Sequence, residues 1–366
     1  MTALLERPAR TVPTIVFGPN WFAGVMGTGI LATAAVSLPV RVPGLHAVAT
    51  FAWALAAALL VVLVVAALRH ATTYADDPVM AQFWGAPPMA LMTVGAGTLL
   101  IGRDWLGEPA AVAVDLVLWT VGTVLGLVVA VAVPYRMMTR HRVGPDAAFG
   151  GWLMPVVSPM VSAAGGALLV PHVSARAELL LACYAMFGIS LFAAVLVIGQ
   201  LWGRLVLHQA GPARMVPTLW IVLGPLGQSV TAAHLLGRAS EGVLAEPYAT
   251  GAQLAAVLYG VPALGFALFW AALAAAITVR TARAGLPFSL TWWSFTFPVG
   301  TVATGTSGLA LRTGSAMLAG LAVMLYACLL AAWAVVAVRT LRGVRRGDLL
   351  KPAPPAIGSA QARVEE

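Results

Sequence analysis

The sequence is poor in charged residues and in cysteine. Only 9% of its 366 residues are Asp, Glu, Lys or Arg, whereas 60% are hydrophobic; soluble domains have about a quarter charged residues. No soluble core could bury so much apolar surface, so we expect an integral membrane protein. The two cysteines, Cys183 and Cys328, both lie in apolar segments without CxxC spacing, and they indicate neither a disulfide nor a metal site.

The chain also lacks the usual motifs of membrane enzymes. HExxH, CxxC and paired carboxylates are absent from its apolar segments, so an integral-membrane enzyme is the weakest alternative, and neither a cofactor nor a metal is expected. Asp115 lies near the start of its apolar segment. We expect it close to the membrane interface, where a carboxylate costs little, and a relay of buried carboxylates is not supported.

Ten apolar segments are long enough to cross a bilayer, which requires about 20 residues. Residues 1–17 carry Glu6, Arg7, Arg10 and two prolines and contain no apolar core before the first span, so no cleaved signal peptide is expected. We expect a transmembrane domain over residues 18–340 between an N-terminal tail, 1–17, and a C-terminal tail, 341–366. The predicted spans are 18–38, 46–69, 85–102, 111–133, 151–171, 178–207, 217–237, 250–280, 290–311 and 314–339.

The basic residues predict the orientation in the membrane. With ten spans both tails lie on one side, and that side carries 16 of the 21 basic residues. By the positive-inside rule it is the cytoplasm. We therefore expect a multi-pass protein of the cell membrane with both termini cytoplasmic, and the net charge of +8 does not indicate nucleic-acid binding.

A tryptophan opens five of the segments, at intervals of 63 to 72 residues, and a glycine or proline cluster follows each one. Similarity at a fixed period indicates a copied structural unit. Helices interrupted at matching positions of repeats are typical of transport pathways. The repeated residues are Trp21, Trp84, Trp152, Trp220 and Trp292.

The odd and even spans differ in composition. The even spans are mostly Ala, Val and Leu, which suits contact with lipid, whereas the odd spans carry Gly, Pro, Ser and Thr. Small residues allow helices to pack closely, and irregular backbone at membrane depth is tolerated only inside protein or along a cavity. We expect an all-α fold of five tandem helical hairpins, with an inner ring of odd helices around a central pore and an outer ring of even helices.

Several strings resemble one family of anion transporters. NWFAGVMGTGI opens the first span and WWSFTFPVGT the ninth, and GWLMPVVSP, GPLGQS and PALGFALFW lie between them. On these strings the chain resembles the tellurite-resistance/dicarboxylate transporter family, which includes malate permeases, sulfite efflux pumps and plant slow anion channels. The resemblance covers residues 18–340. It implies a pore in each subunit of a homotrimer and a small anion substrate, such as malate, succinate, sulfite or tellurite. A passive chloride or nitrate channel is the alternative.

The same resemblance implies a gate. In relatives an aromatic residue of the ninth helix closes the pore, and the matching residue here is Phe297, directly before Pro298. Because proline lacks an amide hydrogen, we expect Pro298 to disrupt the helix at this point. The alternative is that Phe297 is an ordinary core aromatic.

Ten polar side chains on the odd spans are candidates for contact with an anion. Hydroxyl and amide donors can replace part of a hydration shell without holding the ion too tightly, and a histidine could couple a proton to transport. The alternatives are hydroxyls bonded to their own backbone and a hydrogen-bonded histidine at a helix end. The candidates are Thr28, Thr93, Ser158, Ser162, Gln228, Ser229, Thr301, Thr304, Thr306 and His234.

One arginine follows each odd span on the predicted external side. Fivefold repetition would place these arginines around one outer mouth, where they would attract anions. The alternative is that they snorkel at the interface, and glutamates of the same loops could neutralise some of them. The five arginines are Arg41, Arg103, Arg176, Arg238 and Arg312.

Overall fold

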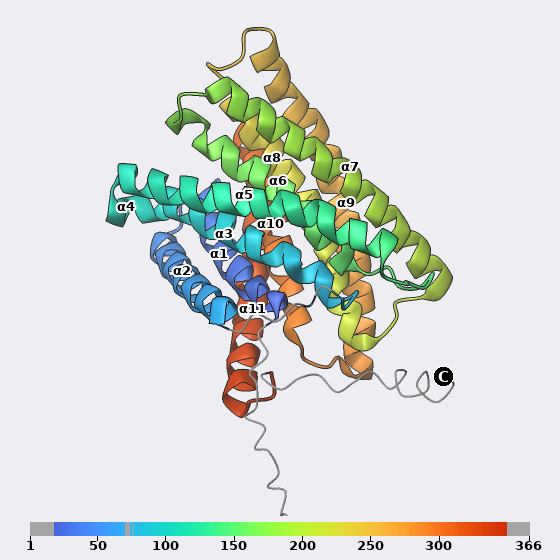
Figure 1. The fold of residues 1–366 in the computed structure, drawn as a ribbon. Coiled ribbons are helices and arrows are strands. Elements are labelled where there is room, and N and C mark those ends of the chain that lie inside the picture. Colours follow the sequence, from blue (N-terminus) through green and yellow to red (C-terminus); the bar gives the residue numbers. More distant parts are fainter. Residues whose placement is uncertain (1–17, 70–73, 75, 350–366) are drawn as a thin grey trace, which may run out of the picture.

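The computed structural model describes residues 18–69, 74 and 76–349, and this part of the chain is helical without a strand. The predicted tail 1–17 and residues 350–366 of the predicted C-terminal tail lie outside the described residues. Figure 1 shows the helices packed side by side in one bundle. The predicted all-α fold is therefore confirmed.

The helices form five consecutive hairpins, each with a shorter inner helix and a longer outer helix that pack against each other. Eight segments of the described chain are long and apolar enough to cross a membrane. The shorter α1 and α10 occupy the first and ninth predicted spans. The hairpins are α1 (Phe22–Ser37) with α2 (Leu45–Arg69), α3 (Ala86–Gly97) with α5 (Glu108–Thr139), α6 (Leu153–Leu169) with α7 (Arg176–His208), α8 (Leu223–Ala239) with α9 (Tyr248–Gly285), and α10 (Phe297–Thr313) with α11 (Ala316–Arg346).

The inner helices form a closed ring. α1 packs against α3, α3 against α6, α6 against α8 and α8 against α10, and α10 returns to α1. Each outer helix also contacts the next inner helix, so α2 packs on α3 and α11 packs on α1. In Figure 1 the long outer helices α5 and α7 cross in front of the inner ring. Burial follows the two layers: the apolar stretch around α6 is 94% buried, whereas that of α2 is 22% buried.

A 3-10 helix precedes every inner helix and holds the repeated tryptophan. α1 has 16 residues and spans about 24 Å at about 1.5 Å per residue. Its 3-10 turn adds about 6 Å, so together they match a hydrocarbon core of about 30 Å. The expected interruptions therefore lie at the starts of the inner helices rather than within them. The 3-10 helices are Pro19–Trp21, Met80–Gly85, Gly150–Trp152, Ala213–Val222 and Leu290–Phe295.

The second inner helix, α3, departs from the common pattern at its other end. α3 continues without a break into a π-helix, Thr98–Gly102, and then into the short α4, Arg103–Leu106. The indole of Trp53 on α2 packs against Gly97 and Gly102. Its N–H donates to the Thr98 hydroxyl at 3.0 Å. One outer tryptophan therefore holds the wider turn of the π-helix in place.

The most extensive contact between helices joins α8 and α10. Gly227 of α8 lies directly against the backbone of Thr301 and Val302, and Gly305 of α10 lies against Val230. A Cβ atom on Gly227 would stand 2.6 Å from the carbonyl carbon of Thr301. Since the obstacle is backbone, a larger residue there requires one helix to move.

Replacing Gly227 with Ala should therefore destabilise the protein by about 1–3 kcal/mol, the usual cost of overpacking. The measurement is the thermal unfolding midpoint of the detergent-purified protein, which is expected to fall. Gly265→Ala on the lipid side of α9, where nothing lies within 4 Å of a new Cβ, is the matched control and should not lower the midpoint. Equal midpoints for Gly227→Ala and the unchanged protein would contradict the tight contact.

Candidate functional site

A cavity of about 280 Å³ is lined by side chains from all five inner helices. Thr33 comes from α1, Thr93 from α3, Val161 from α6, Gln228 from α8 and Thr304 from α10. Because these helices form a closed ring, a single space that touches all of them lies inside the ring. We call this space the central cavity.

Phe297 separates the central cavity from a second, smaller one. The second cavity has a volume of about 30 Å³ and is also lined by all five inner helices, near their starts. Phe297 is the one residue that lines both cavities, and it is 6% exposed. The two cavities therefore follow one another along the axis of the inner ring of helices, with the phenyl group of Phe297 between them. We call the second space the inner cavity.

The backbone break that places Phe297 occurs at Thr296. This residue links the 3-10 helix Leu290–Phe295 to α10, with φ −105° and ψ −77°. The Thr296 hydroxyl donates to the carbonyl oxygen of Trp293 at 2.7 Å, and its side chain lies against Gly27 of α1. The expectation that Pro298 disrupts the helix is corrected. Pro298 lies in the first turn of α10, where its missing N–H costs no helical hydrogen bond.

Four of the ten polar candidates line the central cavity: Thr93, Gln228, His234 and Thr304. The Thr93 hydroxyl donates to the Met89 carbonyl oxygen at 2.7 Å. Gln228 is 6% exposed, and its amide forms no hydrogen bond with the described residues. Among the four candidates it alone combines burial with a side chain that lacks such a bond. An unsatisfied buried amide is costly, and the central cavity is where a partner for it can bind.

The other six candidates lie outside the central cavity, and their hydroxyls bond to protein. The Thr28 hydroxyl donates to the Gly24 carbonyl oxygen and accepts from the indole of Trp333 on α11. The Ser229 hydroxyl accepts from Tyr259 on α9. These six hydroxyls fasten helices together or bond to backbone, which is the alternative raised for such residues. They are Thr28, Ser158, Ser162, Ser229, Thr301 and Thr306.

Sequence reasoning missed three polar residues of the central cavity: Thr33 and Ser37 of α1 and Thr231 of α8. It named Arg238 of α8 as an arginine of the outer mouth, and this residue also lines the central cavity. The signal for the α8 residues was present: Thr231, His234 and Arg238 follow Gln228 at steps of three or four, which places all four on one helix face. The hydroxyls of Thr231 and Thr304 share a hydrogen bond of 2.7 Å between the neighbouring helices α8 and α10.

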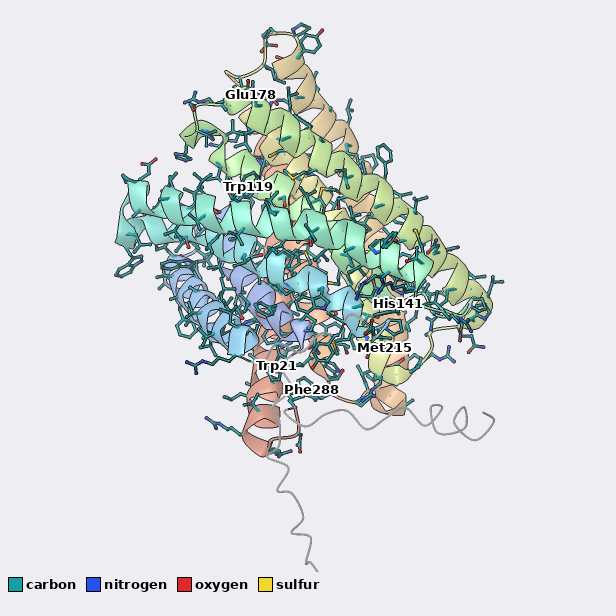
Figure 2. The ribbon with its side chains drawn as sticks, in the orientation of Figure 1. Trp21, Trp119, His141, Glu178, Met215 and Phe288 are labelled. Carbon is teal, nitrogen blue, oxygen red and sulfur yellow. The ribbon has the colours of Figure 1, made fainter. Side chains whose placement is uncertain are left out.

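The five predicted external arginines are divided among several spaces. All lie at the same end of the bundle, in the last turn of an inner helix or shortly after it, and Figure 2 shows Glu178, beside Arg176, far from Trp21, Met215 and Phe288 at the other end. Arg238 alone among the five lines the central cavity. Arg103 and Arg176 join it around a separate space of about 550 Å³. Arg312 lines a different pocket, and Arg41 lines none of these spaces.

Asp115 is buried between two helices. It is 1% exposed and lies against Gly95, between α5 and α3. Its Oδ2 atom has no hydrogen-bond partner among the described residues. The sequence did not indicate this burial, because position along a helix does not reveal which neighbour covers that turn. Asp115 lines neither the central nor the inner cavity.

A ring of short helices around two aligned cavities, covered by apolar outer helices, defines a multi-pass membrane protein with a transport pathway. The family model of SLAC1, voltage-dependent anion channel, matches residues 16–341, and the chain belongs to this family of anion channels and transporters. The resemblance read from the sequence strings is confirmed. Family members are transporters or channels rather than enzymes.

Several curated proteins are similar along most of their length. An uncharacterized transporter of Methanocaldococcus jannaschii is 26% identical, over 92% of this chain and 95% of its own. The sulfite efflux pump SSU1 of Trichophyton rubrum is 27% identical, over 82% of this chain and 83% of its own. The sulfite efflux pump SSU1 of Arthroderma otae is 26% identical, over 89% of this chain and 90% of its own.

Removal of the free amide from the central cavity should weaken anion passage. A hydrogen bond to a charged group contributes about 1.5–3 kcal/mol, so Gln228→Leu is expected to lower anion flux into liposomes about tenfold or more. Thr306→Val is the matched control, since the Thr306 hydroxyl bonds to the Val302 carbonyl oxygen and lies outside the cavity. Equal losses in both variants would contradict a specific role for Gln228.

Proposed function

We propose that this protein passes small oxyanions such as sulfite through the central cavity and that Phe297 is the gate of this path. The supporting observation is that Phe297 alone lines both the central and the inner cavity, each of which touches all five inner helices. A path through the centre of the inner helices must pass this side chain. In this proposal the phenyl group of Phe297 closes the path between the two cavities.

The polar groups of the central cavity suit an anion that must also leave. Its lining contains the free Gln228 amide, threonine hydroxyls and one arginine, but no acidic residue. Such donors replace part of the hydration shell, and uncharged donors bind an anion weakly enough to release it, which conduction requires. Arg238 adds a positive charge near the outer end of α8, which raises the local concentration of anions.

The choice of sulfite rests on the relatives rather than on cavity size. A water molecule occupies about 30 Å³ in the liquid, so the central cavity of about 280 Å³ admits a C4 dicarboxylate such as malate as well as sulfite. Two of the relatives above are named as sulfite efflux pumps. The second candidate, passive conduction of chloride or nitrate, is favoured by the description of the family as voltage-dependent anion channels.

The gate proposal is tested by Phe297→Ala in proteoliposomes with a sulfite gradient. Without the ring the two cavities join, so sulfite flux is expected to rise at least about tenfold, which corresponds to about 1.4 kcal/mol of barrier. Chloride flux measured at a fixed membrane potential then separates the two candidates: a sulfite transporter retains a preference for sulfite in the unchanged protein, and a chloride or nitrate channel does not.

Phe295→Ala is the control for the gate experiment. The Phe295 ring packs edge-on against Trp220 and Trp292, at centroid distances of 5.5 and 5.6 Å, and lines neither cavity. Its truncation should lower stability, as Phe→Ala changes in packed sites do by about 3–5 kcal/mol, and should not raise flux. Increased flux in Phe295→Ala, with only lost stability in Phe297→Ala, would remove Phe297 from the gate.

The proposed orientation places the 3-10 starts of the inner helices on the cytoplasmic side. A cysteine at exposed Val143, in the loop after α5, should then be shielded from an impermeant thiol reagent applied to intact cells. A cysteine at exposed Ala245, in the loop after α8, should react. Cys183 is buried and Cys328 lies within α11, so neither is expected to add much background. Labelling at 143 but not at 245 would reverse the orientation.

A further inference from the structure

A pocket of about 130 Å³ lies beside the central cavity, between α8, α9 and α10. We call it the side pocket. His234 and Arg238 line both spaces, whereas Arg312, Glu241 and Gln253 line the side pocket but not the central cavity. The two spaces therefore share a wall at the outer end of α8.

The side pocket carries an excess of hydrogen-bond donors and of positive charge. Neither Arg238 nor Arg312 forms an ion pair or a side-chain hydrogen bond with the described residues, and the Gln253 amide is likewise unpaired there. Glu241 supplies one carboxylate. With His234 neutral, the pocket keeps a net charge of about one positive unit. Guanidinium groups bind oxyanions well because their N–H donors form a planar fork.

His234 is placed in the shared wall by a glycine of the neighbouring helix. A Cβ atom on Gly308 of α10 would stand 2.7 Å from Cγ of His234, so this turn of α10 leaves room for the imidazole. Arg238 of α8 and Arg312 of α10 line the side pocket together with His234, so two guanidinium groups from neighbouring helices border the space that the imidazole borders. A negative charge in the pocket would reduce their mutual repulsion.

The volume of the side pocket limits the size of the anion. At about 30 Å³ for each water molecule, 130 Å³ corresponds to about four waters. An oxyanion with one central atom and three or four oxygens has this size. A C4 dicarboxylate has about twice as many heavy atoms and would extend beyond this volume.

We propose that the side pocket is an anion-binding site for small single-centre oxyanions, held by Arg238, Arg312 and Gln253, from which the anion enters the central cavity past His234. The proposal rests on the proposed function only for that last step, because binding in the pocket does not require conduction. If the anion passes through this site, the preferred substrates are oxyanions of about the size of sulfite.

The test measures binding of sodium sulfite to the full-length, detergent-purified protein from the shift of its thermal unfolding midpoint, at constant ionic strength. Arg312→Gln and Gln253→Leu change the side pocket without touching the central cavity. Each is expected to weaken sulfite binding, Arg312→Gln about tenfold or more, because it removes a charge-assisted hydrogen bond. Glu241→Gln should tighten binding by removing the opposing carboxylate. Arg41→Gln, an external arginine outside these cavities, should leave binding unchanged.

Two further results separate the possible occupants of the pocket. Sodium malate, which would extend beyond the pocket, should lose less of its shift in Arg312→Gln than sodium sulfite does. Short-chain phosphatidylglycerol carries a phosphate of similar chemistry. If this lipid stabilises the protein through Arg312 and sulfite does not, the pocket is a lipid headgroup site and the proposal is overturned.

Equal sulfite affinity in Arg312→Gln, Gln253→Leu and the unchanged protein would also overturn the proposal. If Arg312→Gln or Gln253→Leu does not fold, the remaining variant and the opposite effect of Glu241→Gln still test the proposal. Binding with the expected pattern but without sulfite flux in liposomes would contradict the proposed function and leave the side pocket as an oxyanion site. Sulfite flux in liposomes together with unaltered sulfite binding in these variants would support the proposed function and contradict the side-pocket site.

Discussion

The structure depends on one constraint: inside a bilayer, irregular backbone is tolerated only where protein or a cavity surrounds it. Every inner helix begins with a 3-10 turn, and α3 also ends in a π-helix. Neighbouring helices pack on these irregular segments: α5 contacts Met80–Gly85 and the π-helix, α9 contacts Ala213–Val222, and α11 contacts Leu290–Phe295. The ring can therefore keep a cavity at its centre. Close approach of α8 and α10 at Gly227 and Gly305 contributes to closing the ring, and without that closure the cavity would open to lipid.

The two layers are joined by indole groups, and this explains where several polar side chains point. Trp53 donates to Thr98, Trp333 to Thr28, and Trp119 to the carbonyl oxygen of Ser162. In Figure 2 Trp119 lies on α5 beside α6. A hydroxyl of an inner helix therefore has two possible tasks, contact with the cavity or attachment of the outer layer. Composition alone does not separate the two.

The hairpins and the two layers could be predicted from the sequence because the repeat and the change in composition both act over whole helices. The arrangement of the five external arginines could not be predicted in this way, because a ring of arginines requires the same backbone geometry in every repeat. Arg103 begins α4 and Arg176 begins α7, whereas Arg238 and Arg312 lie in the last turns of α8 and α10. The position of Phe297 between two cavities came from family resemblance, since twelve phenylalanines share its chemistry.

The distribution of charge along the path indicates where its main barrier lies. Positive groups gather at the C-terminal ends of the inner helices, where Arg238 lines the central cavity, but no charged residue lines the inner cavity. That cavity, at about 30 Å³, has room for about one water molecule, so an anion cannot rest there while the Phe297 ring stays in place. For the proposed path to open, the Phe297 ring must therefore move. Because Thr296 is held by Trp293 and Gly27, rotation of the Phe297 side chain is a smaller change than movement of α10.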